Sequence, residues 1–140
     1  MPVYGNGENI RDWLFVEDHC IALEKIFSKG KVGETYNIAG SNEIKNIDIV
    51  KIICDIMDEL KPSKNGSYRD LITFVDDRPG HDKRYAVDST KIQNILKWNP
   101  RESFQSGIKK TIKWYLNNED WWRKIQKNNY NQQRLGLKNK

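Results

Sequence analysis

The chain has 140 residues and a formal net charge of +5 at pH 7, and 37% of its residues are hydrophobic and 31% charged. This length suits one domain. Since no apolar run could span a bilayer and no secretory signal opens the sequence, we expect a cytoplasmic protein that does not enter a membrane. The two cysteines, Cys20 and Cys54, occur without a Cys-x-x-Cys or clustered histidine motif, so we expect buried thiols in a reducing compartment and no metal site.

Short runs rich in branched and aromatic residues predict three strands, over residues 11–16, 35–39 and 71–75. Residues 2–7 are expected to form a short extended piece followed by a turn. Residues 85–87 have the same character and are expected to be extended.

Apolar residues spaced three and four positions apart predict four helices, over residues 17–27, 47–60, 89–96 and 104–116. Asn46, Asp88 and Ser103 precede the last three of these and are N-cap candidates. For Asn46, capping alone would account for the residue type.

Strands and helices are mixed along the chain, which predicts an α/β class with α+β-like character. The strands are too few and too short for the complete sheet of a doubly wound fold. A thin sheet leaves strand edges exposed unless something covers them. Oligomer formation through those edges is therefore one alternative for this protein.

The positive charge is concentrated at the C-terminal end. Residues 121–140 carry six Lys and Arg and no acidic residue, which gives +6 there and leaves −1 for residues 1–120. Because this end is rich in Asn, Gln and Lys, we expect a folded domain over residues 1–122 and a disordered basic tail over residues 123–140. Nucleic-acid binding through such a tail is the least favoured function.

Residues 78–85, Arg-Pro-Gly-His-Asp-Lys-Arg-Tyr, hold the densest group of functional side chains. Pro79 restricts φ and Gly80 reaches conformations closed to other residues, so the pair predicts a tight turn. An arginine guanidinium binds phosphate oxygens in pairs, so a phosphorylated ligand could use the charged groups around this turn. The alternative is a solvated surface turn whose charges pair among themselves.

The sequence resembles the C-terminal, substrate-binding part of the dTDP-glucose 4,6-dehydratases, which are extended short-chain dehydrogenases/reductases (SDRs). The matching segments are residues 2–7, 10–19, 36–40, 42–48, 77–88 and 98–115, so the resemblance extends from residue 2 to about residue 122. Related sugar-nucleotide epimerases and decarboxylases share the Arg-Asp-aromatic strand. The Arg-Pro-Gly-His-Asp turn and the Lys-Asn-Ile-Asp start of the second helix favour the dTDP-glucose dehydratases.

The resemblance implies ten residues that bind the dTDP-sugar substrate. They are Pro2, Val3, Tyr4, Arg11, Asn46, Asp77, Arg78, Pro79, Gly80 and His81. The first three would line the nucleotide pocket, Arg11 would contact the diphosphate and Asn46 the nucleotide part. Residues 77–81 would close over the nucleotide and its phosphates.

The resemblance also implies chemistry that this chain does not supply. The family fold begins with a Gly-rich NAD loop, and its catalysis uses a Tyr-x-x-x-Lys pair and an Asp-Glu pair. None of the six tyrosines is followed by Lys at the fourth position. Hydride transfer needs a bound nicotinamide, and elimination of water needs a positioned acid and base. We therefore expect no catalytic residue and no cofactor on this chain, with NAD belonging to the full-length family enzyme.

The favoured interpretation is the substrate-binding part of an NAD-dependent lyase that converts dTDP-glucose to dTDP-4-dehydro-6-deoxyglucose, as in rhamnose or other deoxysugar biosynthesis. It would derive from a truncated or split gene, or be an excised piece of a longer protein. Alone, it would bind a dTDP-sugar weakly without turnover, and a separate N-terminal NAD-binding half could be its partner. The main alternative is a non-catalytic module that self-associates or binds another protein.

Overall fold

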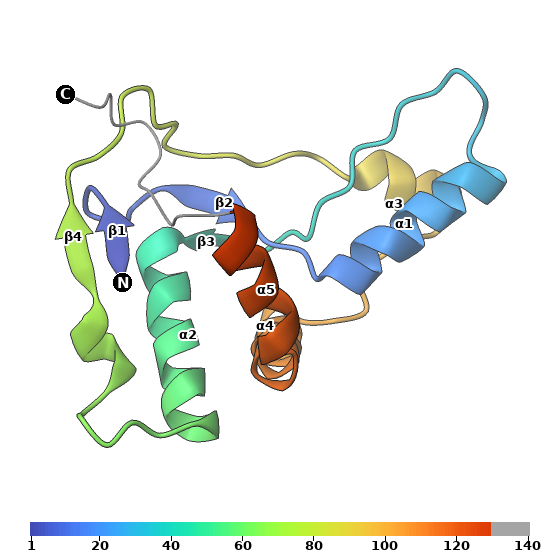
Figure 1. Ribbon diagram of the computed structural model, residues 1–140. Coiled ribbons are helices and arrows are strands. Elements are labelled where there is room, and N and C mark those ends of the chain that lie inside the picture. Colours follow the sequence, from blue (N-terminus) through green and yellow to red (C-terminus); the bar gives the residue numbers. More distant parts are fainter. Residues whose placement is uncertain (130–140) are drawn as a thin grey trace.

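The computed structural model describes residues 1–129. Its elements follow one another as β1 (Pro2–Tyr4), β2 (Ile10–Asp12), α1 (Val16–Lys29), β3 (Glu43–Lys45), α2 (Asn46–Leu60), the 3₁₀ helix η1 (Tyr68–Leu71), β4 (Thr73–Val75), α3 (Thr90–Leu96), α4 (Phe104–Asn117) and α5 (Glu119–Asn129). Figure 1 shows the strands gathered beside α2, with α1 and α3 together on the opposite side of the molecule.

The described strands form two separate two-stranded sheets. β1 and β4 are parallel, with Val3 opposite Phe74, and β2 and β3 are antiparallel, with Arg11 opposite Ile44. A single parallel bridge also joins Ile10 to the segment after β4. Within residues 1–129 the fold is therefore α/β with few short strands and without a complete doubly wound sheet, in agreement with the predicted fold class.

The four predicted helices are all present, with ends that differ by one or two residues. Ser103 caps α4 as expected, because its side chain accepts a hydrogen bond from the Ser106 backbone N–H at 3.1 Å. The capping role predicted for Asn46 is wrong. The chain already turns into the helix at Lys45, so Asn46 is the first residue of α2 and no side chain caps that end.

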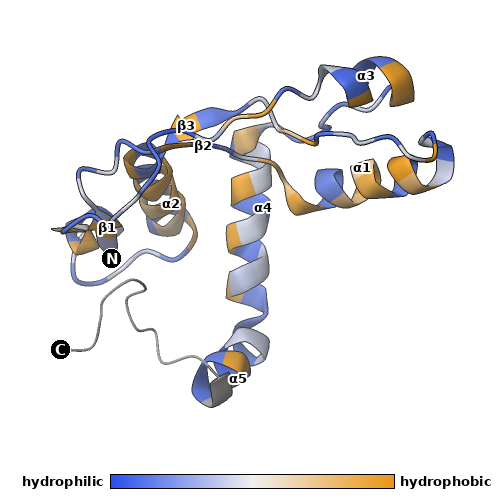
Figure 2. Ribbon diagram, turned by 90° about the horizontal axis from the view of Figure 1, so that it is seen from above, coloured by the Kyte–Doolittle hydropathy of each residue, from blue (hydrophilic) through white to orange (hydrophobic). Residues whose placement is uncertain are grey.

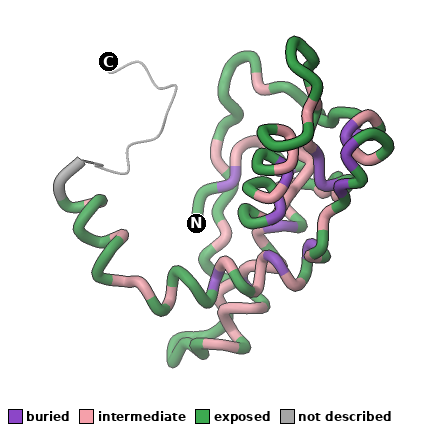
Figure 3. Tube along the Cα trace, turned by 90° about the vertical axis from the view of Figure 1, so that its right-hand side faces the viewer, coloured by how far each residue is buried: buried purple, intermediate pink, exposed green. Residues whose placement is uncertain are grey.

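The main hydrophobic core lies between α1 and α3. Ala22 of α1 and Ile92 of α3 are fully buried, and Leu96 and Trp98 complete the cluster. Figure 3 shows that buried residues occur in short separate stretches and that most of the described chain is exposed or half-buried. The core is therefore small for a chain of this length.

The predicted strand at residues 35–39 is wrong, and the strand predicted for residues 11–16 is confined to β2. A strand needs a neighbour that completes its hydrogen-bond ladder, and residues 35–39 have none within the described chain. At the last residue of β2, the Asp12 carboxylate accepts hydrogen bonds from the backbone N–H groups of Gly40, Ser41 and Asn42 at 2.7–3.2 Å.

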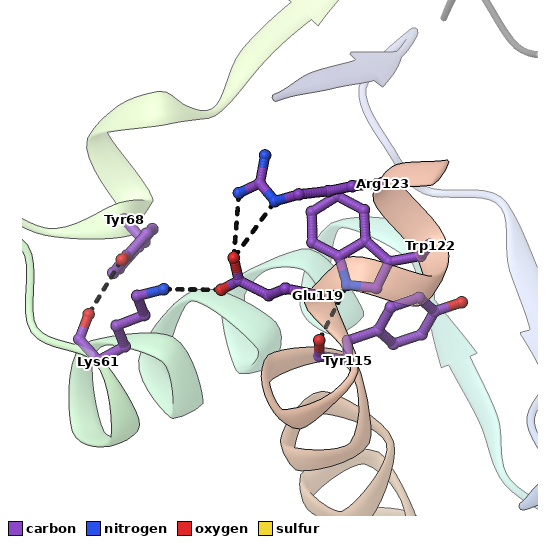
Figure 4. A network of polar contacts seen from close by, with 6 residues as sticks. All are labelled: Lys61, Tyr68, Tyr115, Glu119, Trp122 and Arg123. Atoms are coloured by element: carbon purple, nitrogen blue, oxygen red, sulfur yellow. Dashed lines mark hydrogen bonds and ion pairs between the residues drawn. The ribbon is translucent and has the colours of Figure 1, made fainter. Parts of the chain in front are cut away.

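The predicted start of the disordered tail at residue 123 is also wrong, because α5 continues to Asn129. Glu119 accepts from Lys61 at 3.0 Å and from Arg123 at 3.1 Å, and the Trp122 indole donates to the Tyr115 carbonyl at 2.9 Å. Figure 4 shows how these contacts tie α5 to α2 and α4. The prediction for residues 130–140 lies outside the described residues.

Cys20 was expected to be buried and is exposed, whereas Cys54 is buried in α2 as expected. Cys20 precedes the buried Ala22 by two positions, so the helical period places it on the opposite side of α1. Burial raises the pKa of the Cys54 thiol, and the charge of Asp55 adds to the effect.

Candidate functional site

The bend at residues 76–82 directly follows β4 and folds back on β1. The Gly5 backbone N–H donates to the Val75 carbonyl at 2.8 Å, and Gly80 turns the chain with a φ of 68°. The Asp77 carboxylate accepts hydrogen bonds from the Arg78 backbone N–H at 2.8 Å and pairs with His81 Nδ1 at 2.7 Å. The contact with His81 is the main cause that holds the pKa of Asp77 below its ordinary value.

His81 fastens the bend to β1. Its side chain is only 5% exposed, and its ring meets the Tyr4 ring edge-on with centroids 6.2 Å apart. An edge-to-face aromatic pair of this kind fixes orientation as well as burying area. The predicted residues Tyr4, Asp77 and His81 are therefore brought together, although more than seventy positions separate the first two.

Arg11 on β2 reaches the end of the same bend. Its guanidinium donates to the Ile10 carbonyl at 2.6 Å and to the Asp82 carbonyl at 2.9 Å, and its Cζ lies 4.2 Å from the centroid of the Tyr85 ring. It forms no ion pair with a carboxylate of residues 1–129. A planar guanidinium has five N–H donors, so donors remain for an anionic ligand.

The positive charges of two arginines, Arg11 and Arg78, both affect the Tyr85 hydroxyl. Its hydroxyl donates to the Asp82 carboxylate, which raises the pKa of the phenol. The positive charges of Arg11 and Arg78 oppose this rise, so both guanidinium groups lie within electrostatic reach of Tyr85. Arg78 is exposed, and its side chain has no hydrogen bond or ion pair within the described part of the chain.

Arg84 differs from these two arginines. It forms a bidentate pair with Glu43 of β3 at 2.5 and 2.8 Å, which raises the pKa of Arg84 and lowers that of Glu43. Binding a phosphate there would require breaking this pair. Of the three arginines around the bend, Arg11 and Arg78 are thus the two available for an anion.

The remaining predicted residues differ in accessibility. Val3 is buried beneath the start of α2, where a side chain at Gly7 would collide with both Val3 and Ile47. Pro2 is exposed, and so is Pro79 at the tip of the bend. Asn46 is half-buried at the start of α2, with its backbone N–H bonded to the Asn9 carbonyl at 2.9 Å. Its side chain has no hydrogen bond within residues 1–129.

Asn9 is a structural member of the site that sequence reasoning missed. It is buried, with 8% exposure, and its Nδ2 donates to the Asp82 carbonyl at 3.2 Å. The same carbonyl accepts from Arg11, so Asn9 and Arg11 together hold the end of the bend. The sequence offered no signal for this residue, because a polar residue two positions after Gly7 is typical of an ordinary turn.

Two hollows of the surface lie apart from this cation pair. One of about 770 Å³ lies between residues 13–17 and α4 and is lined mainly by apolar side chains. A second, open hollow at Gly5 and residues 74–77 carries two carboxylates. Among residues 1–129, three or more His, Cys, Asp or Glu side chains nowhere gather in a way that suits a metal ion. No helix in the same range is long and apolar enough to cross a bilayer.

Comparison with known proteins gives this arrangement a context. Residues 1–111 match the protein family described as GDP-mannose 4,6 dehydratase. The chain belongs to this family. A dTDP-glucose 4,6-dehydratase of Escherichia coli is 57% identical over 140 residues, which are 98% of this chain and 39% of that protein. One from Neisseria meningitidis is 55% identical over 97% of this chain and 39% of the relative.

Solved structures of the dTDP-glucose 4,6-dehydratases share this member's fold. The Bacillus anthracis enzyme in complex with NAD has a TM-score of 0.76 at 42% identity, over 89% of this chain and 37% of its own. The Streptomyces venezuelae enzyme with NAD and TYD bound has a TM-score of 0.79 at 34% identity, over 89% and 36%. The predicted resemblance is therefore confirmed, and this chain spans about two fifths of the length of these relatives.

Proposed function

We propose that this chain is the dTDP-sugar-binding part of a dTDP-glucose 4,6-dehydratase and that alone it binds its ligand without converting it. The identity to relatives of that name supports the proposal. One geometric observation carries it: Arg11 of β2 contacts Asp82, at the end of the bend at residues 76–82, and Tyr85 just beyond it. Two cations from distant parts of the sequence thus border one bend.

The diphosphate of the sugar nucleotide is the part of the ligand that this geometry fits. Arg11 and Arg78 have no carboxylate partner among residues 1–129, so a phosphate displaces no ion pair when it binds them. Each charge-assisted contact contributes about 1.5–3 kcal/mol. The Asn46 side chain, which caps nothing, has donors and an acceptor for the nucleotide part.

Turnover would require groups that this chain lacks. The sequence has no Tyr-x-x-x-Lys pair, and NAD and the catalytic residues would belong to a separate N-terminal polypeptide. The role of this chain would be to bind and orient the sugar nucleotide for that partner. Orientation of a bound substrate is itself a large part of catalysis.

Calorimetry with dTDP tests the proposal. We expect weak binding to the wild-type chain and about 10- to 150-fold weaker binding to Arg11→Ala, as the loss of one charged contact implies. Arg101→Ala is the matched control, since Arg101 is exposed and has no side-chain partner within the described residues. Equal affinity of the wild-type and Arg11→Ala chains would remove Arg11 from the site. No binding to the wild type would contradict the proposal.

A turnover assay tests the second half of the proposal. With dTDP-glucose and added NAD, the chain alone should form no 4-keto product over hours. Product formation by the chain alone would show that it holds catalytic groups that the proposal assigns to a partner.

A further inference from the structure

Two Asn-Gly dipeptides occur in the sequence, at Asn6-Gly7 and at Asn65-Gly66. Such a pair is chemically labile, because the backbone nitrogen of the glycine can attack the side-chain amide of the asparagine. Glycine favours this attack, since it has no Cβ atom that would obstruct the ring that forms. Both asparagines are exposed, so exposure alone does not distinguish the two sites.

The attack requires a particular local conformation. The glycine nitrogen has to turn toward the asparagine side chain and give up its proton, together with any hydrogen bond that the proton makes. The side-chain amide and the peptide group between the two residues must also be free to rotate. A dipeptide that is hydrogen-bonded and packed is therefore held away from the reactive geometry, whereas one on an unbonded loop can reach it.

The Asn6-Gly7 pair is held by hydrogen bonds at both residues. The Gly7 backbone N–H donates to the Tyr4 carbonyl at 3.1 Å, and the Gly7 carbonyl accepts from the Ile47 backbone N–H at 2.9 Å. The Asn6 Oδ1 atom accepts from the Glu8 backbone N–H at 3.1 Å. The nitrogen that would attack and the amide that would be attacked are thus both already bonded.

Gly7 is also enclosed by side chains. It is buried, and a Cβ atom there would lie 2.8 Å from the Ile47 Cβ and 2.9 Å from a Val3 methyl group. Figure 2 shows that α2, which is rich in apolar residues drawn in orange, lies beside β1. Rotation of the peptide group between Asn6 and Gly7 would drive Gly7 into these closely packed neighbours.

The Asn65-Gly66 pair is exposed, in the loop between α2 and η1. The Asn65 backbone N–H donates to Ser63 Oγ at 3.1 Å, but the Asn65 side chain and the Gly66 backbone N–H have no hydrogen bond within residues 1–129. The Asp70 carboxylate lies beside Gly66 but accepts from the Ser67 backbone N–H, at 3.1 Å. Gly66 has a φ of 107°, and glycine occupies positive and negative φ about equally readily.

This loop is fixed at its ends and not at its tip. The Tyr68 backbone N–H donates to the Asp58 carboxylate at 3.0 Å, and the Tyr68 hydroxyl donates to the Lys61 carbonyl at 2.9 Å. These contacts hold the two ends of the loop together. Asn65 and Gly66 can therefore change conformation while the surrounding fold stays intact, as exposed tips with small and polar residues commonly do.

We propose that Asn65 is a site of spontaneous deamidation and that the fold protects Asn6 from the same reaction. The Gly66 nitrogen bonds to Cγ of Asn65 and gives up its proton, and the side-chain amide nitrogen leaves as ammonia, which closes a succinimide ring. Water then adds to one of the two ring carbonyl carbons. Cleavage of the bond between the nitrogen and Cγ gives aspartate, and cleavage of the bond between the nitrogen and the main-chain carbonyl carbon gives isoaspartate. The overall change consumes water and releases ammonia, without oxidation or reduction.

The modified residue lies far from the candidate phosphate site. The strand of Arg11 pairs with β3, which leads into the start of α2, whereas the loop follows the end of α2 (Figure 1). A helix of 15 residues is about 22 Å long. Deamidation of Asn65 does not depend on the proposed function, because no residue of the candidate site takes part in it.

Peptide mass spectrometry of the wild-type chain tests the assignment, after incubation for several weeks at mildly alkaline pH, where amide nitrogens lose a proton more readily. We expect the peptide with Asn65 to gain the mass of one deamidation at least about tenfold faster than the peptide with Asn6. An L-isoaspartate methyltransferase with S-adenosylmethionine should methylate the same peptide. Asn65→Gln is the matched variant, because its longer side chain would have to close a larger ring, and it should remove the fast reaction.

The chain unfolded in guanidinium chloride provides the internal control. Unfolding removes the hydrogen bonds of Gly7 and its packing against Val3 and Ile47. Each dipeptide is then an Asn-Gly pair in a mobile chain. We therefore expect Asn6 and Asn65 to react at similar rates, so that a difference between them in the folded chain measures the protection by the fold.

Three results would overturn the proposal. The first is an Asn65 that stays unmodified in the folded chain over the period in which the unfolded chain reacts. The second is a folded chain in which Asn6 reacts as fast as Asn65, which would mean that the contacts of Gly7 give no protection. The third is a mass gain at Asn65 without any isoaspartate, which would indicate direct hydrolysis of the side-chain amide in place of the succinimide.

Discussion

The Nη2 atom of Arg11 donates a hydrogen bond to the carbonyl oxygen of Asp82 at 2.9 Å, although 71 positions separate the two residues. The Nδ2 atom of Asn9 donates to the same oxygen at 3.2 Å. One carbonyl thus receives two donors from the segment around β2, which fixes the end of the bend beside Arg11. The candidate phosphate site therefore depends on a backbone acceptor as much as on its cations.

Asn9→Ala should lower the free energy of unfolding by about 0.5–1.5 kcal/mol. The substitution removes one donor to Asp82, while Arg11 still bonds to that carbonyl, so the loss is that of one neutral hydrogen bond. Urea denaturation measures it. Asn94→Ala on the exposed surface of α3 is the control and should change stability by less than about 0.5 kcal/mol. If Asn9→Ala leaves the free energy of unfolding unchanged, this hydrogen bond does not contribute to stability.

The pair between Asp77 and His81 predicts a dependence of stability on pH. The pKa of Asp77 is lowered in the folded chain, chiefly by His81. The carboxylate therefore stabilises the fold fully at pH values above the ordinary carboxyl pKa of about 3.9. This contribution is lost as pH falls through the lowered folded-state pKa. The stability difference between the wild type and Asp77→Asn should therefore be full at pH 6 and shrink below about pH 4.

Denaturation midpoints measured from about pH 6 to pH 2.5 check this dependence. Asp120→Asn is the control, since the Asp120 side chain is exposed and forms no ion pair among the described residues. A difference between the wild type and Asp77→Asn that stays constant across this range would mean that the carboxylate charge plays no part.

Gly40→Ala should destabilise the fold by about 3 kcal/mol, because overpacking against backbone cannot be relieved by a side-chain rotation. A Cβ atom at this position would lie 2.1 Å from the Trp13 carbonyl oxygen. Gly33→Ala is the matched control. Gly33 has open space around it and only a φ of 83° to strain, which costs about 1–2 kcal/mol. Thermal unfolding of both variants gives the order of their stabilities. If Gly40→Ala is more stable than Gly33→Ala, the backbone at Gly40 does not lie close to the Trp13 carbonyl oxygen.

Trp98→Ala should lower the free energy of unfolding by about 3–5 kcal/mol. Trp98 is only 1% exposed and fills the centre of the cluster between α1 and α3. Trp121→Ala provides the comparison on a residue of the same size, because Trp121 is 56% exposed and its ring meets that of Trp114 edge-on. It should lose no more than about 1.5 kcal/mol. Similar losses for the two would mean that the cluster does not hold the fold together.

Much of the helical structure could be predicted from local periodicity, because an amphipathic helix carries its signal within one stretch. The short strands could not be predicted as reliably, since their existence depends on partners elsewhere. Residues 35–39 have a strand-like composition without a neighbour, whereas Ile10–Asp12 form a strand because β3 lies beside them. Helix α5 was missed because its composition is polar. The spacing of Glu119 and Arg123 was the signal that could have found it.

Only part of the candidate site could be predicted from the sequence. The composition of the Arg-Pro-Gly-His turn suggested an anion site, but the link to Arg11 came from the resemblance to a family. No local pattern shows that Asp82 returns to β2, because that contact follows from the parallel β1–β4 pairing and the bridge at Ile10. The role of Asn9 could not be predicted for the same reason, since it depends on a hydrogen bond to Asp82, 73 positions away.

The parallel pairing of Pro2–Tyr4 with Thr73–Val75 has a consequence for the newborn chain. Ribosomes add about 5–20 residues per second, so β1 emerges roughly 4–14 s before the strand it pairs with. Helices α1 and α2 need only neighbouring residues and can form during that interval. The pairing of β1 with β4 is therefore a late step of folding during synthesis. Until β4 has emerged, a chaperone that binds extended segments has access to β1.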